Sequence, residues 1–218
     1  MKLNGPYLTL AGGLAVAGVL LSLSVTAVHK DGIVATSSPV GSVVAGKAKP
    51  TEKAKATLDS EAVPTGTYAG AVKGGAASIA IAIKNGKAIA YVCDGKAAEA
   101  WLQGSAADSS LSLKGQGSST LTAKYVDGRL SGTVKTGGKK WTFKVKTVQA
   151  PSGLYRASRN VRKAKVVGGW IVYRGKQVGM LNTAGTETPA PPIDLATRTV
   201  TIDGTTVETA AVDGSSLG

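Results

Sequence analysis

The chain has 218 residues, with 26 Lys plus Arg against 13 Asp plus Glu and a formal net charge of +13. Its 43% of apolar residues are mostly Ala and Val, and with 29 glycines this composition favours short strands and tight turns over long helices. One histidine, His29, and one cysteine, Cys93, exclude an internal disulfide, Ser-His-Asp or Cys-His catalysis in the folded domain, and zinc sites of the usual spacing. We therefore expect an all-β protein that is not an enzyme and that holds no metal or cofactor.

An uncharged apolar segment lies near the start of the chain. Tyr7 to Val28 is 22 residues long, enough to cross a hydrocarbon core of about 30 Å at about 1.5 Å per residue. We predict that residues 1–29 form one transmembrane helix, a single-pass signal-anchor in the cell membrane that leaves the rest of the chain extracytoplasmic. The alternative is a signal peptide cleaved near Ala27, which makes the protein secreted. Both interpretations place the folded part outside the cytoplasm.

Residues 30–65 have the composition of a flexible linker. They are rich in Ala, Ser, Thr, Gly, Val, Pro and Lys and contain no aromatic residue, and such a chain reaches roughly 30 Å. Gly41 to Ala48 nearly matches the phosphate-binding loop G-x-x-x-x-G-K-[ST]. Ala48 lacks the hydroxyl that holds magnesium, and Pro50 disfavours the helix that should follow. We therefore interpret this motif as linker.

Residues 66–150 alternate short apolar and polar runs with turn signals, of which Asn85-Gly86 is the strongest for a hairpin. The predicted strands are 68–72, 77–83, 88–93, 111–114, 120–126, 129–135 and 141–147, whereas 97–103 fits either a strand or a helical turn. Their loops are too short for crossovers, so neighbouring strands must be antiparallel. One apolar face on such a meander predicts a small barrel, with a sandwich as the alternative.

Alternate positions of these strands carry the side chains that we expect to point inward. They are Ile79, Ile81, Ile83, Ile89, Tyr91, Cys93, Leu111, Leu113, Leu121, Ala123, Tyr125, Leu130, Gly132, Val134, Trp141, Phe143 and Val145. Cys93 is therefore predicted to be buried and inert, against the alternative of a reactive or intermolecular cysteine. Trp101 lies out of phase with Leu102 and belongs either to a rim or contact surface or to a cover over the barrel end.

The C-terminal part, residues 151–218, is predicted to contain a pair of β-hairpins. The predicted strands are 166–173, 177–181, 198–202 and 205–210, with a Pro-rich loop at 186–194. Because two hairpins bury too little apolar surface to be stable alone, we expect them to pack on the barrel. Trp170 and Tyr173 are the expected docking residues.

Three short motifs in this part resemble a known group of proteins. They are Gly153-Leu-Tyr-Arg-Ala157, Gly168-Gly-Trp-Ile-Val172 and Gln177-Val-Gly179. They resemble functionally uncharacterised, membrane-tethered exported proteins of high-GC Gram-positive bacteria. The resemblance extends from Gly66 onward, implies an envelope location and supplies no catalytic residue.

Charge is concentrated in the barrel region, where residues 66–158 carry 13 basic against 4 acidic side chains, a net charge of +9. A basic run follows it, and its members are the predicted partner-binding residues: Arg156, Arg159, Arg162, Lys163 and Lys165. This surface predicts an anionic polymer of the envelope, lipid headgroups or a membrane protein as the partner. Nucleic acid ranks last, because no aromatic side chains interleave the basic ones. The bland alternative is charge that only maintains solubility.

The sequence offers few candidate catalytic residues. Asp94 and Glu99 are the only carboxylates of the barrel region that lie close together, and Asp94 stands in an Asp-Gly turn, where Asp is common for backbone reasons. We therefore predict a membrane-tethered, non-catalytic binding or scaffold module of the bacterial cell envelope. The alternative is a small β-barrel that carries an apolar ligand, because an eight-stranded barrel either holds one small ligand or is filled by its own side chains.

Overall fold

The computed structural model describes residues 62–217, and every regular element among them is a β-strand. This confirms the all-β prediction for this part of the chain. The predicted transmembrane segment and nearly all of the linker lie outside the described residues. Within residues 62–217 no helix has the length and apolar character needed to cross a bilayer.

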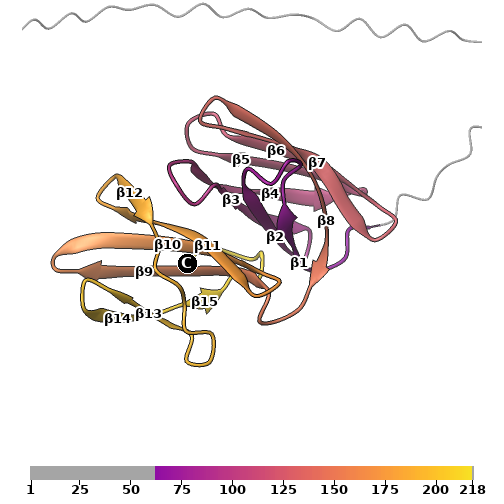
Figure 1. The fold of residues 1–218 in the computed structure, drawn as a ribbon. Helices are drawn as coiled ribbons and strands as arrows, with labels where there is room; N and C mark the ends of the chain where they lie inside the picture. Colours follow the sequence, from indigo (N-terminus) through magenta and orange to yellow (C-terminus); the bar gives the residue numbers. More distant parts are fainter. Residues whose placement is uncertain (1–61, 218) are drawn as a thin grey trace, which may run out of the picture. The chain divides into compact units, whose positions relative to one another are not determined.

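Eight strands form a closed antiparallel barrel in chain order, and β1 closes it by pairing with β8 (Figure 1). Their bounds are β1 Gly66–Ala71, β2 Ser78–Lys84, β3 Lys87–Cys93, β4 Glu99–Ala107, β5 Ser110–Gly115, β6 Thr120–Val126, β7 Arg129–Thr136 and β8 Lys139–Val148. The barrel is therefore confirmed over the sandwich. The ambiguous segment 97–103 belongs to a strand, β4.

Tight turns set the strand boundaries. Asn85 and Gly86 have φ values of 51° and 73°, and Asp127 and Gly128 have 52° and 71°. Two successive residues with positive φ are the signature of the type I′ hairpin turn, which Asn-Gly and Asp-Gly favour. These dipeptides explain why the predicted and observed strand ends agree closely there.

Large side chains fill the inside of the barrel. Tyr68 packs edge to face against Tyr125, with ring centroids 6.2 Å apart, and Phe143 and Leu102 belong to the same buried cluster. Most of the predicted inward residues are in this cluster, among them the isoleucines of β2. A continuous cluster of this kind favours a barrel that is filled by its own side chains.

The predicted orientation of β3 was wrong. Ala88, Ala90 and Val92 face the barrel core, whereas Ile89, Tyr91 and Cys93 belong to a different cluster on the outer side. All but the first residue of β3 is buried, so the strand is apolar on both faces and its alternation does not identify the inner one. The small alanines lie inside because large residues of neighbouring strands already occupy the core.

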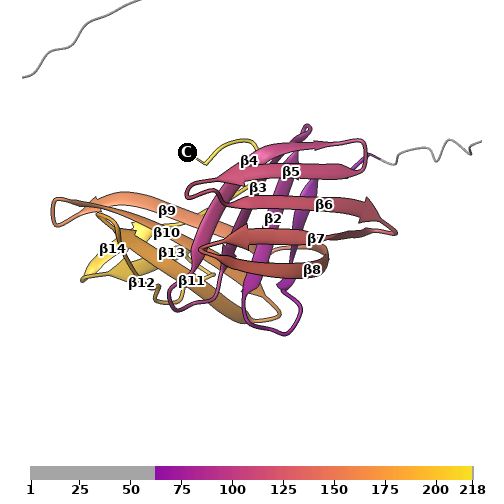
Figure 2. The same ribbon diagram turned by 90° about the horizontal axis from the view of Figure 1, so that it is seen from above.

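A second sheet covers the outer side of β3. It has five strands in the order β12-β11-β10-β9-β15, and a separate hairpin, β13-β14, accompanies it (Figures 1 and 2). The bounds are β9 Gly153–Val161, β10 Ala164–Tyr173, β11 Lys176–Thr183, β12 Thr186–Pro189, β13 Thr199–Ile202, β14 Thr205–Glu208 and β15 Ala210–Ala211. Both predicted hairpins exist, but β9, β12 and β15 extend the β10–β11 hairpin into a larger sheet, while β13–β14 stays separate.

Opposite faces of β10 belong to different cores. Ile171 and Tyr173 pack with the outer residues of β3, together with Leu154 and Met180. Trp170 points the other way, into the cluster beneath β13 and β14, where its indole Nε1 donates a hydrogen bond to the carbonyl of Pro191 at 2.8 Å. Trp170 therefore does not dock on the barrel as expected, whereas Tyr173 packs against the cluster that joins the barrel and the sheet.

Trp101 lies at the contact between the barrel and the second sheet. This agrees with its interpretation as part of a contact surface. The centroids of the Trp101 and Tyr91 rings are 4.4 Å apart, and Gly169 of β10 packs against both rings. A Cβ atom at Gly169 would lie 2.6 Å from Trp101 Cζ2 and 2.7 Å from Tyr91 Cζ. Only glycine fits at this position without displacing the two rings.

Candidate anion-binding surface

The outward side of β5–β8, which we call the basic face, carries cations and hydroxyls. Inward positions of these strands hold Leu, Val, Tyr and Phe, so the alternation places the polar residues outside. The outward cations are Lys114, Lys124, Arg129, Lys135, Lys140, Lys144 and Lys146, and Arg129 alone is only half-exposed. None of the residues in these four strands is Asp or Glu.

Strand register arranges these side chains in rows that cross the strands. One, the lysine row, runs from β8 to β4 and consists of Lys140, Lys135, Thr120, Lys114 and Gln103. The next, the hydroxyl row, consists of Thr142, Thr133, Thr122, Ser112 and Ser105. Neighbouring strands are about 4.8 Å apart and alternate residues of a strand about 6.6 Å apart. The face is thus a grid of cations with hydroxyl groups between them.

Two pairs of cations oppose each other directly on β7 and β8. Lys135 pairs with Lys140, and Arg129 pairs with Lys146. Directly opposed side chains have Cβ atoms about 5 Å apart, and like charges in that position are destabilising. Among the described residues the ion pairs are Lys84 with Asp213 and Lys139 with Asp94, so no carboxylate neutralises either pair there. This arrangement suits an external anion.

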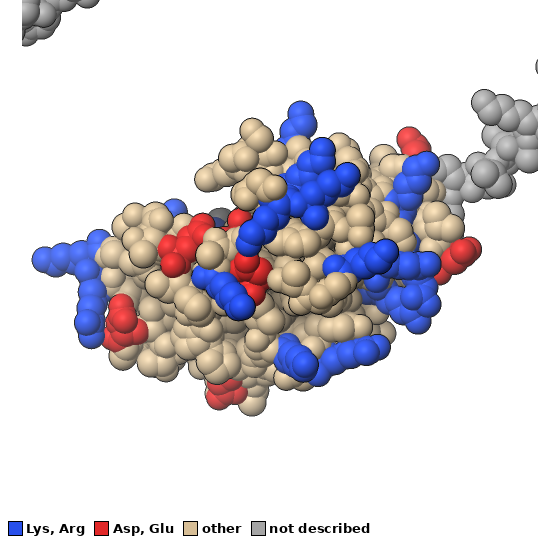
Figure 3. All heavy atoms as spheres, turned by 45° about the horizontal axis from the view of Figure 1, so that its top comes forward, with Lys and Arg blue, Asp and Glu red and all other residues tan. Residues whose placement is uncertain are grey.

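Figure 3 shows Lys and Arg side chains distributed over the barrel, with some Asp and Glu near its outer end and beside the second sheet. The described residues contain one large exposed apolar side chain, Val126, which is 56% exposed. The basic face therefore attracts anions without offering an apolar patch or an aromatic platform.

The five partner-binding residues predicted from the sequence do not share one face. Arg159 occupies the same alternate positions of β9 as Tyr155 and Ala157, so it lies on the side of the sheet away from the barrel. Arg156 and Lys165 lie on the barrel side of the sheet. The other two, Arg162 and Lys163, occupy the β9–β10 turn with positive φ. Only Arg156 and Lys165 come together, in the cleft described next.

A cleft of about 940 Å³ separates the start of β4 and the end of β5 from the barrel side of β9–β12. Trp101 and Glu99 lie on its barrel wall, together with Lys114 from the lysine row. Arg156, Lys165 and Glu187 line the sheet wall. The cleft is thus continuous with the basic face through Lys114, and it contains charges of both signs.

Arg156 is held in place within this cleft. Its guanidinium lies 5.8 Å from the centroid of the Trp101 ring, and Nη1 donates a hydrogen bond to the carbonyl of Leu217. Partial burial lowers the pKa of Arg156 from its ordinary value, but a guanidinium remains charged at any physiological pH. Arg156 therefore presents a fixed positive charge to the cleft.

Glu99 and Glu187 weaken the positive field of the cleft. Burial raises the pKa of Glu99, the hydrogen bond from Tyr91 opposes this rise, and the charge of Glu187 adds to it. Tyr91 Oη donates that hydrogen bond to Glu99 Oε2 at 2.5 Å. Burial is also the main cause that raises the pKa of Tyr91 well above its usual value, so Tyr91 stays a neutral donor.

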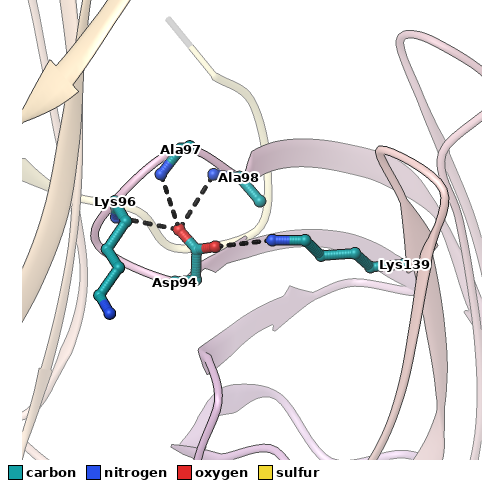
Figure 4. Close-up of polar contacts among 5 residues, drawn as sticks. All are labelled: Asp94, Lys96, Ala97, Ala98 and Lys139. Carbon is teal, nitrogen blue, oxygen red and sulfur yellow. Dashed lines mark hydrogen bonds and ion pairs between the residues drawn. The ribbon is translucent and has the colours of Figure 1, made fainter.

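The other carboxylate considered from the sequence, Asp94, has separate partners (Figure 4). Asp94 Oδ1 accepts hydrogen bonds from the backbone amides of Lys96, Ala97 and Ala98 at 2.9 to 3.0 Å, and Oδ2 pairs with Lys139 Nζ at 3.0 Å. Burial acts to raise the pKa of Asp94, but these hydrogen bonds outweigh it and hold the pKa well below its usual range. Asp94 thus closes the β3–β4 turn.

The cation pairs of the basic face were not identified from the sequence. The pattern of Lys140, Lys144 and Lys146 on alternate positions of one strand was visible, but which cations oppose each other depends on the register between strands. No protein-family model matches the chain, and no curated protein or solved structure matches it either. The chemistry of the site is therefore argued from its geometry.

Proposed function

We propose that this chain is a non-catalytic binding module of the bacterial cell envelope, tethered to the membrane by residues 1–29, whose barrel binds a phosphate-bearing anionic polymer. The observation that supports this most is the basic face, where seven cations occupy outward positions of four strands that contain no Asp or Glu. The proposal joins this face to the extracytoplasmic location expected from the sequence.

An anionic partner explains a charge arrangement that stability alone opposes. Each directly opposed pair of like charges costs roughly 0.2–1 kcal/mol, and the face has two of them. A polyanion that neutralises these cations releases the counterions that otherwise accompany both molecules. The cost to the free protein thus becomes a source of affinity.

A flexible polymer fits the face better than the other predicted partners. The outer wall of a barrel is convex, so a flat lipid surface touches few of its cations at once, whereas a chain follows the curvature. Protein interfaces are depleted in Lys and enriched in aromatic residues, and the basic face has the reverse composition. Stacking platforms for bases are also missing from the outward positions of β5–β8.

The hydroxyl row favours phosphate as the anionic group. Ser and Thr hydroxyls donate hydrogen bonds to phosphate oxygens, while lysine ammonium groups supply charge. Thr142, Thr133 and Thr122 are neighbours in this row, directly beside the lysine row. A phosphate chain lying across the strands meets both kinds of donor.

The test measures binding of the full-length chain, in detergent, to long-chain inorganic polyphosphate at several salt concentrations. A plot of the logarithm of the binding constant against the logarithm of the salt concentration has a negative slope. We expect this slope to become less steep by about 2 in Lys135→Gln/Lys140→Gln, because two phosphate contacts are lost. The control Lys96→Gln/Lys176→Gln removes the same charge from exposed positions outside β5–β8 and should leave the slope unchanged. Salt-independent binding, or an equal loss in the control, would overturn the proposal.

A second measurement separates the polymer from the membrane surface. Vesicles of phosphatidylglycerol and phosphatidylcholine are offered to the same chain, with and without polyphosphate. The proposal expects polyphosphate to bind more tightly than vesicles at equal phosphate concentration. Preference for the vesicles would reassign the face to lipid headgroups.

A further inference from the structure

We infer that the cleft between β4–β5 and β9–β12 binds the phosphate end of the same polymer, while the basic face binds its internal units. This inference rests on the proposed function and adds a second, end-specific site to it. Two observations support it: the continuity of the lysine row with the cleft, and the cations on both walls.

The lysine row leads into the cleft. Lys140, Lys135 and Lys114 follow one another across the barrel, with Thr120 between the last two. Lys114 and Gln103, the last members of the row, both line the cleft. A polymer that follows the row from β8 towards β4 therefore arrives at the cleft mouth.

Cations from separate strands converge on the cleft. Lys114 comes from the barrel wall, and Arg156 and Lys165 come from the sheet wall. Arg156 is fixed by the Leu217 carbonyl and by the Trp101 ring, so its orientation costs little entropy on binding. A terminal phosphate carries more negative charge than an internal unit, so it gains more from this convergence of positive charges.

Trp101, on the barrel wall of the cleft, also belongs to the packed contact between the barrel and the sheet. Its ring packs on Gly169 and Tyr91, and Ile171 lies against the same cluster. Because this contact holds the indole in place, Trp101 reports on a ligand that binds in the cleft.

The higher charge of a terminal phosphate favours it over an internal unit in this cleft. Glu99 and Glu187 reduce the attraction for any anion, so an internal unit with one negative charge binds there only weakly. A terminal phosphate carries a charge of about −1.5 to −2 at neutral pH and gains nearly twice as much from the same cations. End groups should therefore bind in the cleft in preference to internal units.

The experiment compares linear tripolyphosphate, which has two ends, with cyclic trimetaphosphate, which has none, on the full-length chain. We expect the linear probe to shift the Trp101 indole NMR signal, assigned with Trp101→Phe, and the cyclic probe to leave it unchanged. Lys165→Gln should weaken binding of the linear probe about tenfold and alter binding of the cyclic probe little. Equal effects on both probes would overturn the inference.

The matched control is Lys144→Gln, which removes a cation from the basic face outside the cleft. It should weaken long-chain polyphosphate and leave the Trp101 response to tripolyphosphate intact. If Lys165→Gln has no effect while Lys144→Gln reduces the salt slope, the end site is wrong and the proposed function stands. If neither probe nor long-chain polyphosphate binds in a salt-dependent way, the proposed function itself fails.

Discussion

Lys135 of β7 and Lys140 of β8 lie directly opposite each other on the outside of the barrel, with no acidic residue in either strand. Their repulsion leads to a prediction that separates stability from binding. Lys140→Thr should stabilise the free protein by roughly 0.2–1 kcal/mol and should weaken polyphosphate binding. Urea denaturation at low salt measures the first effect.

The control for this prediction is Lys144→Thr on the same strand. Lys144 faces Ser131 across β7, so its removal relieves no directly opposed cation. Both substitutions gain the same β-propensity, and the difference between them isolates the charge repulsion. Equal stabilisation by the two variants would contradict the prediction, as would a difference that persists in molar salt, where exposed charges are screened.

Gly169→Ala should disrupt the contact between barrel and sheet. The added Cβ would meet Trp101 and Tyr91 at 2.6 and 2.7 Å, and relief of such overlap costs about 1–3 kcal/mol. The midpoint of urea denaturation and the tryptophan fluorescence, to which Trp101 contributes, should both change. Gly153→Ala is the control, since a Cβ there meets its nearest neighbour, Tyr155 Cε2, at an ordinary 3.8 Å; a similar loss in both variants would refute the account.

Cys93 should be unreactive in the folded protein. The thiol is fully buried and unpaired to another cysteine, and burial raises its pKa from 9.0 to about 12. A maleimide at pH 8 should modify the native chain at least about a hundredfold more slowly than the chain unfolded in urea, because the reactive species is the exposed thiolate. Rapid native labelling or an interchain disulfide would contradict this.

The raised pKa of Cys93 also predicts that the folded protein loses stability at high pH. The stabilising contribution of the neutral thiol is complete below about pH 9, where the thiol is protonated in both states. It is lost as the pH rises towards 12, because the unfolded thiol ionises first. Cys93→Ala should therefore show a smaller decrease in unfolding free energy between pH 9 and pH 12 than the unchanged chain, measured by urea denaturation.

Asp94→Ala should destabilise the protein more than Lys139→Ala does. The first change leaves the amides of Lys96, Ala97 and Ala98 without their acceptor, which costs about 0.5–2 kcal/mol, as the loss of a side-chain cap does, and it removes the ion pair with Lys139 as well. The second removes an ion pair with a half-exposed lysine, worth at most about 1 kcal/mol.

The contribution of Asp94 to the free energy of unfolding should also depend on pH. Because its pKa is lower in the folded state, its contribution is present above about pH 4 and is lost as the pH falls below that value. Unfolding curves at pH 7 and pH 3 should show a smaller difference between Asp94→Ala and the unchanged chain at pH 3. A constant difference would mean that the carboxylate charge has no part in holding the turn.

The barrel could be predicted from local signals, because dipeptides such as Asn85-Gly86 and Asp127-Gly128 fix where strands end, and short loops fix which strands pair. The orientation of β3 could not, since Ile89 and Ala90 are both buried and only the presence of the second sheet decides which one faces outward. The strand β9 was missed because Arg156 and Arg159 interrupt its apolar pattern.

The candidate site, like the fold, could be predicted from the sequence only in part. The high density of Lys in residues 114–146 was apparent, but the opposition of Lys135 and Lys140 depends on register, and the cleft depends on how two sheets meet. Arg156 and Lys165 were named from the sequence as part of one basic run. Their companion in the cleft, Lys114, is distant in the chain and belongs to another sheet.

The burial of both sides of β3 has a consequence for how this molecule tolerates change. Its outer residues engage the second sheet, so that sheet occupies one flank of the barrel, while β5–β8, apart from Val148 at the end of β8, contribute only their inner sides to packing. Outward substitutions at the other positions of those four strands therefore alter neither core. Selection is free to adjust the charge of that flank to a new ligand, one residue at a time, while the body that carries it keeps its shape.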